Sequence, residues 1–183
     1  PQLFRLTRSE FTPENKLEYT DGNTGMVQGP GFKREIPEVK DFVRIQSEHL
    51  PIKIGNHVFE EDALYTDENF FSIFSFDLKA GDAKTALVEP QSVVVSEELA
   101  KKFFGKTDVL GETIELPLGK NGSFDPFKVT GVVPKSPQNS SIKISMLLPM
   151  KLNMRDGRWD SQWLNFYLNT FVLLDEHADI ARV

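Results

Sequence analysis

Apolar and polar residues alternate along several stretches of this chain with the two-residue period of a β-strand. This alternation predicts strands over residues 3–8, 43–54, 57–65, 113–118, 127–133, 142–148 and 169–174. Between the second and third of these, Gly55-Asn56 predicts a two-residue hairpin turn. Residues 142–148 alternate strictly, which predicts a strand with one face exposed to solvent.

The stretch from Ala63 to Val133 combines strand patterns with two short helical patterns. Asp67 can cap a helix over residues 68–74, because its carboxylate accepts hydrogen bonds from amides that lack an intrahelical partner. Ser92–Val95 is a short apolar run rich in β-branched residues. Such a run is typical of a strand that is covered on both faces.

The second helical pattern begins after Ser96, whose hydroxyl predicts an N-cap. Glu97 and Glu98 would then lie at the positive end of the helix dipole, and Gly105 would end the helix in a left-handed conformation. Its buried stripe is predicted to comprise Leu99, Ala100, Phe103 and Phe104.

Three other segments have weaker patterns. Residues 21–33 contain four glycines and a proline, and we expect a loop there. Pro37 suits the first turn of a short helix, with Val39 and Phe42 or Val43 buried. Residues 175–179 predict a turn that leads into a helix.

Composition narrows the possible functions. Of the 183 residues, 39% are hydrophobic and 26% are charged, as in a globular domain. The formal net charge is -6, and no Lys/Arg cluster is interleaved with aromatic residues, so nucleic acid is not expected as a partner. The absence of cysteine excludes disulfides, thiol nucleophiles and cysteine-bound zinc.

The sequence contains no apolar run near the roughly 20 residues that span a bilayer. It begins with Pro1 rather than Met, and its last residues, 178–183, have the pattern of a helix that is only starting. We therefore expect a piece of a longer protein, truncated at its C-terminus.

Motifs for chemistry are weak. Gly105-Lys106-Thr107 matches the end of a phosphate-binding loop, but Ala100 stands where that loop needs a glycine. The three histidines lie far apart in sequence, which excludes a metal pair on one helix but not a site assembled in space. On the predicted strand 57–65, alternation separates Glu61 from Glu60 and Asp62, so a solvated face is favoured over an acid/base pair.

No catalytic, cofactor-binding or metal-binding residue is therefore predicted, and the protein is not expected to be an enzyme. Aromatic residues concentrate at Trp159, Trp163, Phe166 and Tyr167. They favour a small core packed under a loop. A contact surface for a partner stays an alternative, because Trp and Tyr are frequent at such surfaces.

Four stretches resemble a known family: residues 65–82, 91–105, 109–112, and 127–133 followed by 139–142. Together they are similar to the periplasmic core domain of MacB/FtsX-type ABC transporter permeases, in the variety common in Bacteroidetes. Residues 3–7 and 169–174 resemble the first and the returning strand of that domain. The family usually has proline where this chain has Val109.

This resemblance implies an α+β fold. A membrane-proximal, porter-like βαβ subdomain would comprise residues 1–80 and 151–183. A mostly β subdomain, called Sabre in this family, would be inserted as residues 81–150.

The resemblance also implies a function. The segment would lie in the periplasm between the first and second transmembrane helices of an inner-membrane permease. A cytoplasmic ABC ATPase would hydrolyse ATP, and the energy would reach this non-catalytic domain mechanically for export, extraction or sensing of a substrate. Implied partners are that ATPase, a second permease copy, and a periplasmic adaptor or outer-membrane protein. No cofactor is implied.

Within such a domain, we expect the binding surface on loops 119–126 and 134–141, because loops on rigid scaffolds commonly carry recognition. One alternative is a stand-alone extracytoplasmic module that binds peptides or lipids. Another is an enzyme whose site is assembled from distant carboxylates, which would need a pocket with perturbed pKa values.

Overall fold

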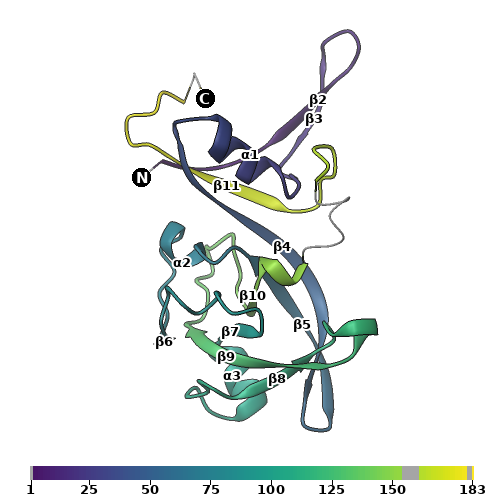
Figure 1. The fold of residues 1–183 in the computed structure, drawn as a ribbon, viewed down its shortest axis with the longest axis vertical. Helices are drawn as coiled ribbons and strands as arrows, with labels where there is room; N and C mark the ends of the chain where they lie inside the picture. The colour runs from purple at the N-terminus through teal and green to yellow at the C-terminus, as the bar shows by residue number, and fades with distance from the viewer. Residues whose placement is uncertain (1, 154–160, 181–182) are drawn as a thin grey trace. The chain divides into compact units, whose positions relative to one another are not determined.

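The computed structural model describes residues 2–153, 161–180 and 183 (Figure 1). Its contacts divide the chain into two compact units. The terminal unit comprises Pro1–Gln46 and Met154–Val183, and the inner unit comprises Ser47–Asn153. Strands predominate and helices are few in the described residues, which confirms the predicted α+β class.

The terminal unit is built on three strands in the order β1-β11-β4, namely β1 (Gln2–Arg5), β11 (Asn169–Leu174) and the first part of β4 (Val39–Ile54). Both neighbouring pairs are antiparallel, so β1 and β4 run in the same direction. Helix α1 (Gln28–Glu35) connects them and lies beside β11 in Figure 1. This is a βαβ crossover with one strand inserted between its two strands.

Strands β2 (Arg8–Phe11) and β3 (Leu17–Asp21) form a separate two-stranded hairpin. Its base is held by Arg8, which makes ion pairs of 2.7 Å with both Glu10 and Asp21. The Arg8 guanidinium also lies 4.3 Å from the centre of the Phe166 ring. A two-stranded hairpin alone is only marginally stable in water, so this anchoring holds it in place.

The inner unit has a mixed sheet with the order β5-β10-β7-β9-β6. These strands are β5 (His57–Thr66), β10 (Met146–Pro149), β7 (Ser92–Ser96), β9 (Asp125–Val133) and β6 (Ala80–Gly81). Strand β8 (Thr113–Leu116) pairs with β9 and with the second part of β4. All five residues of β7 are buried, as its apolar run predicted.

Helix α3 (Glu97–Phe104) follows β7 and agrees with its sequence signals. The Ser96 hydroxyl accepts a hydrogen bond of 3.1 Å from the amide of Leu99, and Gly105 ends the helix with a φ of 67°. Lys79 binds the Glu97 carboxylate and holds its pKa below the usual range. Leu99 and Ala100 are buried, whereas Phe103 is half-buried and packs against the Phe59 ring.

The predicted loop over residues 21–33 is wrong in its second half, where α1 forms. Two glycines explain the difference, because both allow a ring to lie against the helix. A β-carbon on Gly29 would lie 2.5 Å from the Phe42 ring, and one on Gly31 would lie 2.7 Å from the Trp163 ring. Tertiary packing therefore selects glycines that are unfavourable to an isolated helix.

The helix predicted to begin at Pro37 is also wrong. Pro37 follows α1 instead, and Ile36 before it has the extended backbone (φ -111°, ψ 107°) that a following proline favours. From Val39 onward the chain is strand β4.

The strand predicted over residues 142–148 has the wrong bounds. Strand β10 covers only Met146–Pro149 and lies between β5 and β7. All four of its residues are buried, so both of its faces are covered. The helix near Asp67 is shorter than predicted, since α2 covers Phe70–Ile73 and begins after Asn69. The turn predicted after Leu174 is present, but residues 175–180 contain no helix.

The compact units are bounded differently from the predicted subdomains, since residues 47–80 belong to the inner unit. Strand β4 takes part in both units, with residues 39–46 in the terminal unit and 47–54 in the inner unit. The division into porter-like and Sabre-like subdomains stays a prediction. The inner unit also includes α2 and the single-turn helices η1 (Lys120–Gly122) and η2 (Met150–Asn153).

Candidate recognition cleft

A cleft of about 460 Å³ lies in the inner unit, between β5, helix α3 and the segment of residues 134–145. We call it the charged cleft, because three acidic and three basic residues line it. These are Glu61, Asp62, Glu98, Lys102, Lys135 and Lys143. The predicted binding loop 134–141 therefore forms one wall of this cleft.

Ion pairs connect the walls of the charged cleft. Glu61 on β5 binds Lys102 on α3, and the Glu61 side chain is only 14% exposed. Glu98 on α3 pairs with Lys135 of the loop at 2.7 Å. The first pair joins β5 to α3, and the second joins α3 to the loop. These charged side chains therefore connect the walls of the cleft as well as lining it.

The loop wall is also held by its own hydrogen bonds. The Lys143 ammonium donates to the carbonyls of Pro137 and Gln138. The Ser136 hydroxyl accepts from the amide of Ile144 at 3.0 Å. These contacts give the loop a defined conformation, which suits a surface that recognises a partner.

The hydroxyls of the cleft are engaged in structural bonds. Ser96 caps α3, Ser136 binds the Ile144 amide, and Ser145 lies 3.5 Å from the Glu61 carboxylate. None of these three is hydrogen-bonded to a histidine in a way that would activate a nucleophile. In the described part of the chain, no group of three or more His, Cys, Asp and Glu side chains could hold a metal ion.

Strand alternation places Glu61 on the side of Lys102, and Glu60 and Asp62 on the side of His49. The His49 ring lies 2.9 Å from Asp62 and 3.8 Å from Glu60. The hydrogen bond to Asp62 is the main cause that raises the pKa of His49. Glu61 therefore pairs with Lys102 while Asp62 pairs with His49, although both Glu61 and Asp62 line the charged cleft. The expected solvated position is wrong for Glu61, whose side chain is paired inside the cleft.

In the sequence, Glu61 stands out only as part of the acidic run 60–62, and no pattern marks Glu98 or Lys102 as a site residue. Glu61 and Lys102 lie 41 positions apart in sequence, and only the packing of α3 beside β5 brings them together. A faint signal existed in the alternation of the 60–62 run. The other predicted binding loop, residues 119–126, contains η1 and does not line the charged cleft.

The aromatic cluster is divided in the structure. Trp159 lies outside the described residues. Trp163 is 49% exposed, and its ring lies 6.1 Å from that of Phe32 on α1. Phe166 packs against Arg8 at the base of the hairpin. Packing within the terminal unit accounts for these contacts, and the role of Trp163 in binding stays untested.

A family model described as the MacB-like periplasmic core domain matches residues 2–183. The chain belongs to this family. It is therefore a periplasmic domain of a MacB-like ABC transporter permease, as the resemblance implied. No curated protein sequence matches the chain.

Solved structures agree with this membership. A domain of a predicted permease protein from Porphyromonas gingivalis is 25% identical, with a TM-score of 0.77 over 96% of this chain and 73% of that one. The periplasmic region of MacB from Actinobacillus actinomycetemcomitans is 16% identical, with a TM-score of 0.63 over 87% and 69% of the two chains.

A third similar structure comes from Gram-positive bacteria. It is the extracellular domain of the noncanonic ABC-type transporter YknZ, with 17% identity and a TM-score of 0.63 over 96% of this chain and 85% of that one. At these identities, the MacB and YknZ structures support the fold alone.

The family identity favours the permease over a stand-alone binding module, because MacB-like domains belong to ABC transporters that work with ATPase components. Within the described residues, no helix has both the length and the hydropathy needed to cross a bilayer.

Proposed function

We propose that this domain is a non-catalytic mechanical element of its transporter. A cytoplasmic ABC ATPase would hydrolyse ATP, and the resulting motion would pass through the membrane part of the inner-membrane permease to this periplasmic domain. A second permease copy would complete the transporter. The domain would then export, extract or sense a substrate outside the inner membrane.

Strand β4 is the observation that carries this proposal beyond family membership. It is one uninterrupted strand of sixteen residues that contributes to the ladders of both units. Its first residues pair with β11, and Lys53 near its end pairs with Glu115 of β8. Motion applied to the terminal unit would therefore reach the inner unit along the backbone of β4.

The charged cleft and the loops 119–126 and 134–141 are the proposed recognition surface. The cleft presents both signs of charge together with loop carbonyls, a combination that suits a polypeptide better than an apolar molecule. Its occupant would be a substrate or an adaptor protein.

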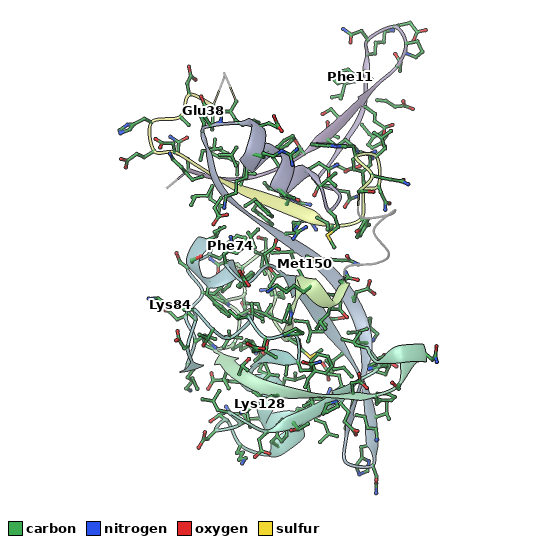
Figure 2. The ribbon with its side chains drawn as sticks, viewed as in Figure 1. Phe11, Glu38, Phe74, Lys84, Lys128 and Met150 are labelled. Carbon is green, nitrogen blue, oxygen red and sulfur yellow. The ribbon has the colours of Figure 1, made fainter. Side chains whose placement is uncertain are left out.

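Spin-label distances test the mechanical proposal. Residues 1–183 contain no cysteine, so Lys84→Cys adds one label site per domain. Lys84 is exposed and lies on the inner unit (Figure 2). In the reconstituted permease with its ATPase, the distance between the labels of the two permease copies should change between nucleotide-free and ATP-trapped states.

A variant with two glycines inserted between Gln46 and Ser47 is the matched control. The insertion interrupts the β4 ladder where the two units meet in sequence. We expect ATP hydrolysis to continue while the nucleotide-dependent change in distance is lost. If the uninterrupted protein gives the same distance in both states, the mechanical proposal is wrong.

Loop exchange tests the recognition surface separately. Replacing residues 134–141 or 119–126 by a Gly-Ser linker should leave the domain folded but unable to complement a strain that lacks the permease. Lys135→Glu places two carboxylates opposite each other at Glu98 and is the milder variant for the cleft. If all three variants complement the strain fully, the assignment of these loops as the recognition surface is wrong.

A further inference from the structure

One edge of strand β5 opens into the charged cleft. Strand β10 runs parallel to β5, but their pairing begins only at Ala63 and Met146. Residues 58–62 of β5 have β4 on one side and no described strand on the other. Their backbone therefore presents an edge with which another extended chain can pair.

The residues that line the charged cleft place it over this edge. Glu61 and Asp62 both line the cleft, although successive side chains of a strand point to opposite faces. A cleft that touches both side chains runs past the edge of the strand rather than over one of its faces. Ile144 and Ser145, which lead into β10, also line the cleft. The cleft thus lies where β5 and the chain before β10 separate.

The two-residue turn at Gly55-Asn56 indicates which backbone groups lie at the edge. The residues that flank such a turn pair through their backbone, so every second residue of β5 from His57 onward bonds to β4. The amides of Glu60 and Asp62 then point away from β4. Pro51 of β4 agrees with this register, because it lies opposite Glu60, where an amide would not be directed at β5.

On the α3 side of β5, the charges of the cleft already have partners. Glu61 binds Lys102, and Glu98 binds Lys135. Leu99 of α3 also lines the cleft. An added strand can therefore place uncharged side chains on this side without leaving a charge unpaired.

On the opposite side of β5, two carboxylates lie two residues apart. The side chains of Glu60 and Asp62 are 60% and 84% exposed, and His49 lies beside both. A protonated His49 would balance only one of the two negative charges. Because cross-strand pairs of opposite charge stabilise a sheet, the neighbouring positions of an added strand favour Lys or Arg.

We infer that the charged cleft binds an extended polypeptide that adds a strand to β5 and carries Lys or Arg at alternate positions, with uncharged residues between them. The basic side chains would face Glu60 and Asp62, and the uncharged ones would face α3. Backbone hydrogen bonds would provide affinity, and the alternation would provide specificity. This inference rests on the proposed recognition function of the cleft and specifies the ligand.

The acidic run 60–62 disfavours two other occupants. A second copy that paired its own β5 edge with this one would place the two acidic runs beside each other, and like charges across strands are destabilising. A surface of anionic lipid would be repelled by the same carboxylates.

Amide hydrogen exchange followed by NMR tests the inference on the 183-residue chain, without membrane or nucleotide. The probe is the synthetic peptide Ac-Thr-Val-Lys-Val-Lys-Val-Thr-NH2, which has lysine at alternate positions. At saturating peptide, the amides of Glu60 and Asp62 should exchange at least about tenfold more slowly, since strand pairing protects them. The amide of Glu61 points to β4 and should change little, so it is the internal control.

Two control peptides separate strand addition from simple attraction between charges. A peptide of the same composition with its two lysines adjacent should bind about fivefold more weakly, because one lysine would face α3. A peptide that is N-methylated at its three central residues cannot donate to β5 from these positions. It should lose about tenfold or more in affinity.

A matched pair of protein variants tests the role of the carboxylates. Glu60→Lys places like charges across the added strand and should weaken binding by about tenfold. Asp77→Lys makes the same change in net charge at another exposed carboxylate of the inner unit, and it should bind the peptide as the unmodified chain does.

Several results would overturn the inference. Equal binding of the N-methylated peptide would show that the contact is not strand addition. Failure to protect Glu60 and Asp62 at any soluble peptide concentration would reject the assigned edge. Protection that rises with protein concentration alone would assign the edge to a second copy, and protection by phosphatidylglycerol vesicles alone would assign it to lipid.

These outcomes can be distinguished from failure of the proposed function. If the loop-exchange variants lose complementation but the peptide protects no amide of β5, the recognition surface is retained and strand addition alone is wrong. If the peptide protects Glu60 and Asp62 while the loop-exchange variants complement fully, strand addition is retained and the assignment of the loops is wrong.

Discussion

The two units of this domain bury their apolar residues to different extents. Among the described residues, eleven large apolar side chains are exposed, of which eight lie in the smaller terminal unit and three in the larger inner unit. The inner unit encloses strands such as β7, whose five residues are all buried. The inner unit therefore has a well-buried core, whereas the terminal unit leaves more of its apolar side chains exposed.

The largest loss of stability on a single substitution is expected in the inner unit. Phe70 is fully buried. The centre of its ring lies within 5.4 Å of the ring centres of Phe71, Phe74 and Phe76. Phe70→Ala should lower the free energy of unfolding by about 3–5 kcal/mol, because it removes buried apolar contact and leaves a cavity. Urea unfolding followed by circular dichroism measures this change.

The same substitution in the terminal unit supplies the control. Phe4 is 37% exposed, so Phe4→Ala should cost less than about half as much in the 183-residue chain. Equal losses for Phe70→Ala and Phe4→Ala would contradict the difference between a closed core and an open face.

Helix α1 offers the next prediction. Alanine normally stabilises a helix relative to glycine by about 1 kcal/mol. At Gly29 the sign should reverse, because the added β-carbon would lie 2.5 Å from the Phe42 ring. Gly29→Ala should destabilise by about 1–3 kcal/mol, measured as a shift in the urea midpoint. In the double variant, Phe42→Ala should remove most of the overpacking that Gly29→Ala introduces. If Gly29→Ala alone stabilises the protein, the close packing of Gly29 against Phe42 is wrong.

A smaller effect is expected at the cap of α3. Ser96→Ala removes the acceptor of the Leu99 amide and should cost about 1 kcal/mol. Ser96→Thr keeps a hydroxyl and should retain most of the stability. If alanine and threonine behave alike in thermal unfolding, the cap contributes nothing measurable to the inner unit.

The smallest change in stability is expected from the pH dependence of the His49–Asp62 pair. Its bond to Asp62 raises the pKa of the imidazole, so the pair stabilises the folded state below the ordinary pKa near 6.5, and this contribution disappears as pH rises through the raised value. Because His49 is well exposed, the change in stability should be slight. NMR titration should show a lower His49 pKa in Asp62→Asn and no change in Asp77→Asn.

Local signals predicted much of the inner unit. The hairpin of β4 and β5, the buried strand β7 and the helix from Ser96 to Gly105 all depend on neighbouring residues, such as a capping hydroxyl or a two-residue turn. The charged cleft was predicted only through its loop wall. Glu61 and Lys102 belong to different elements, so no local pattern could pair them.

By itself, the sequence determined the α+β class, the family, and the elements whose ends carry their own turn or cap chemistry. The tertiary structure decided the rest, because distant residues changed what local patterns favoured. The rings of Phe42 and Trp163 pack against glycines of α1, where the sequence predicted a loop. Cover on both faces of β10 removed the expected alternation of buried and exposed residues. The position of β1 beside β11 likewise depends on pairings between residues more than 160 positions apart.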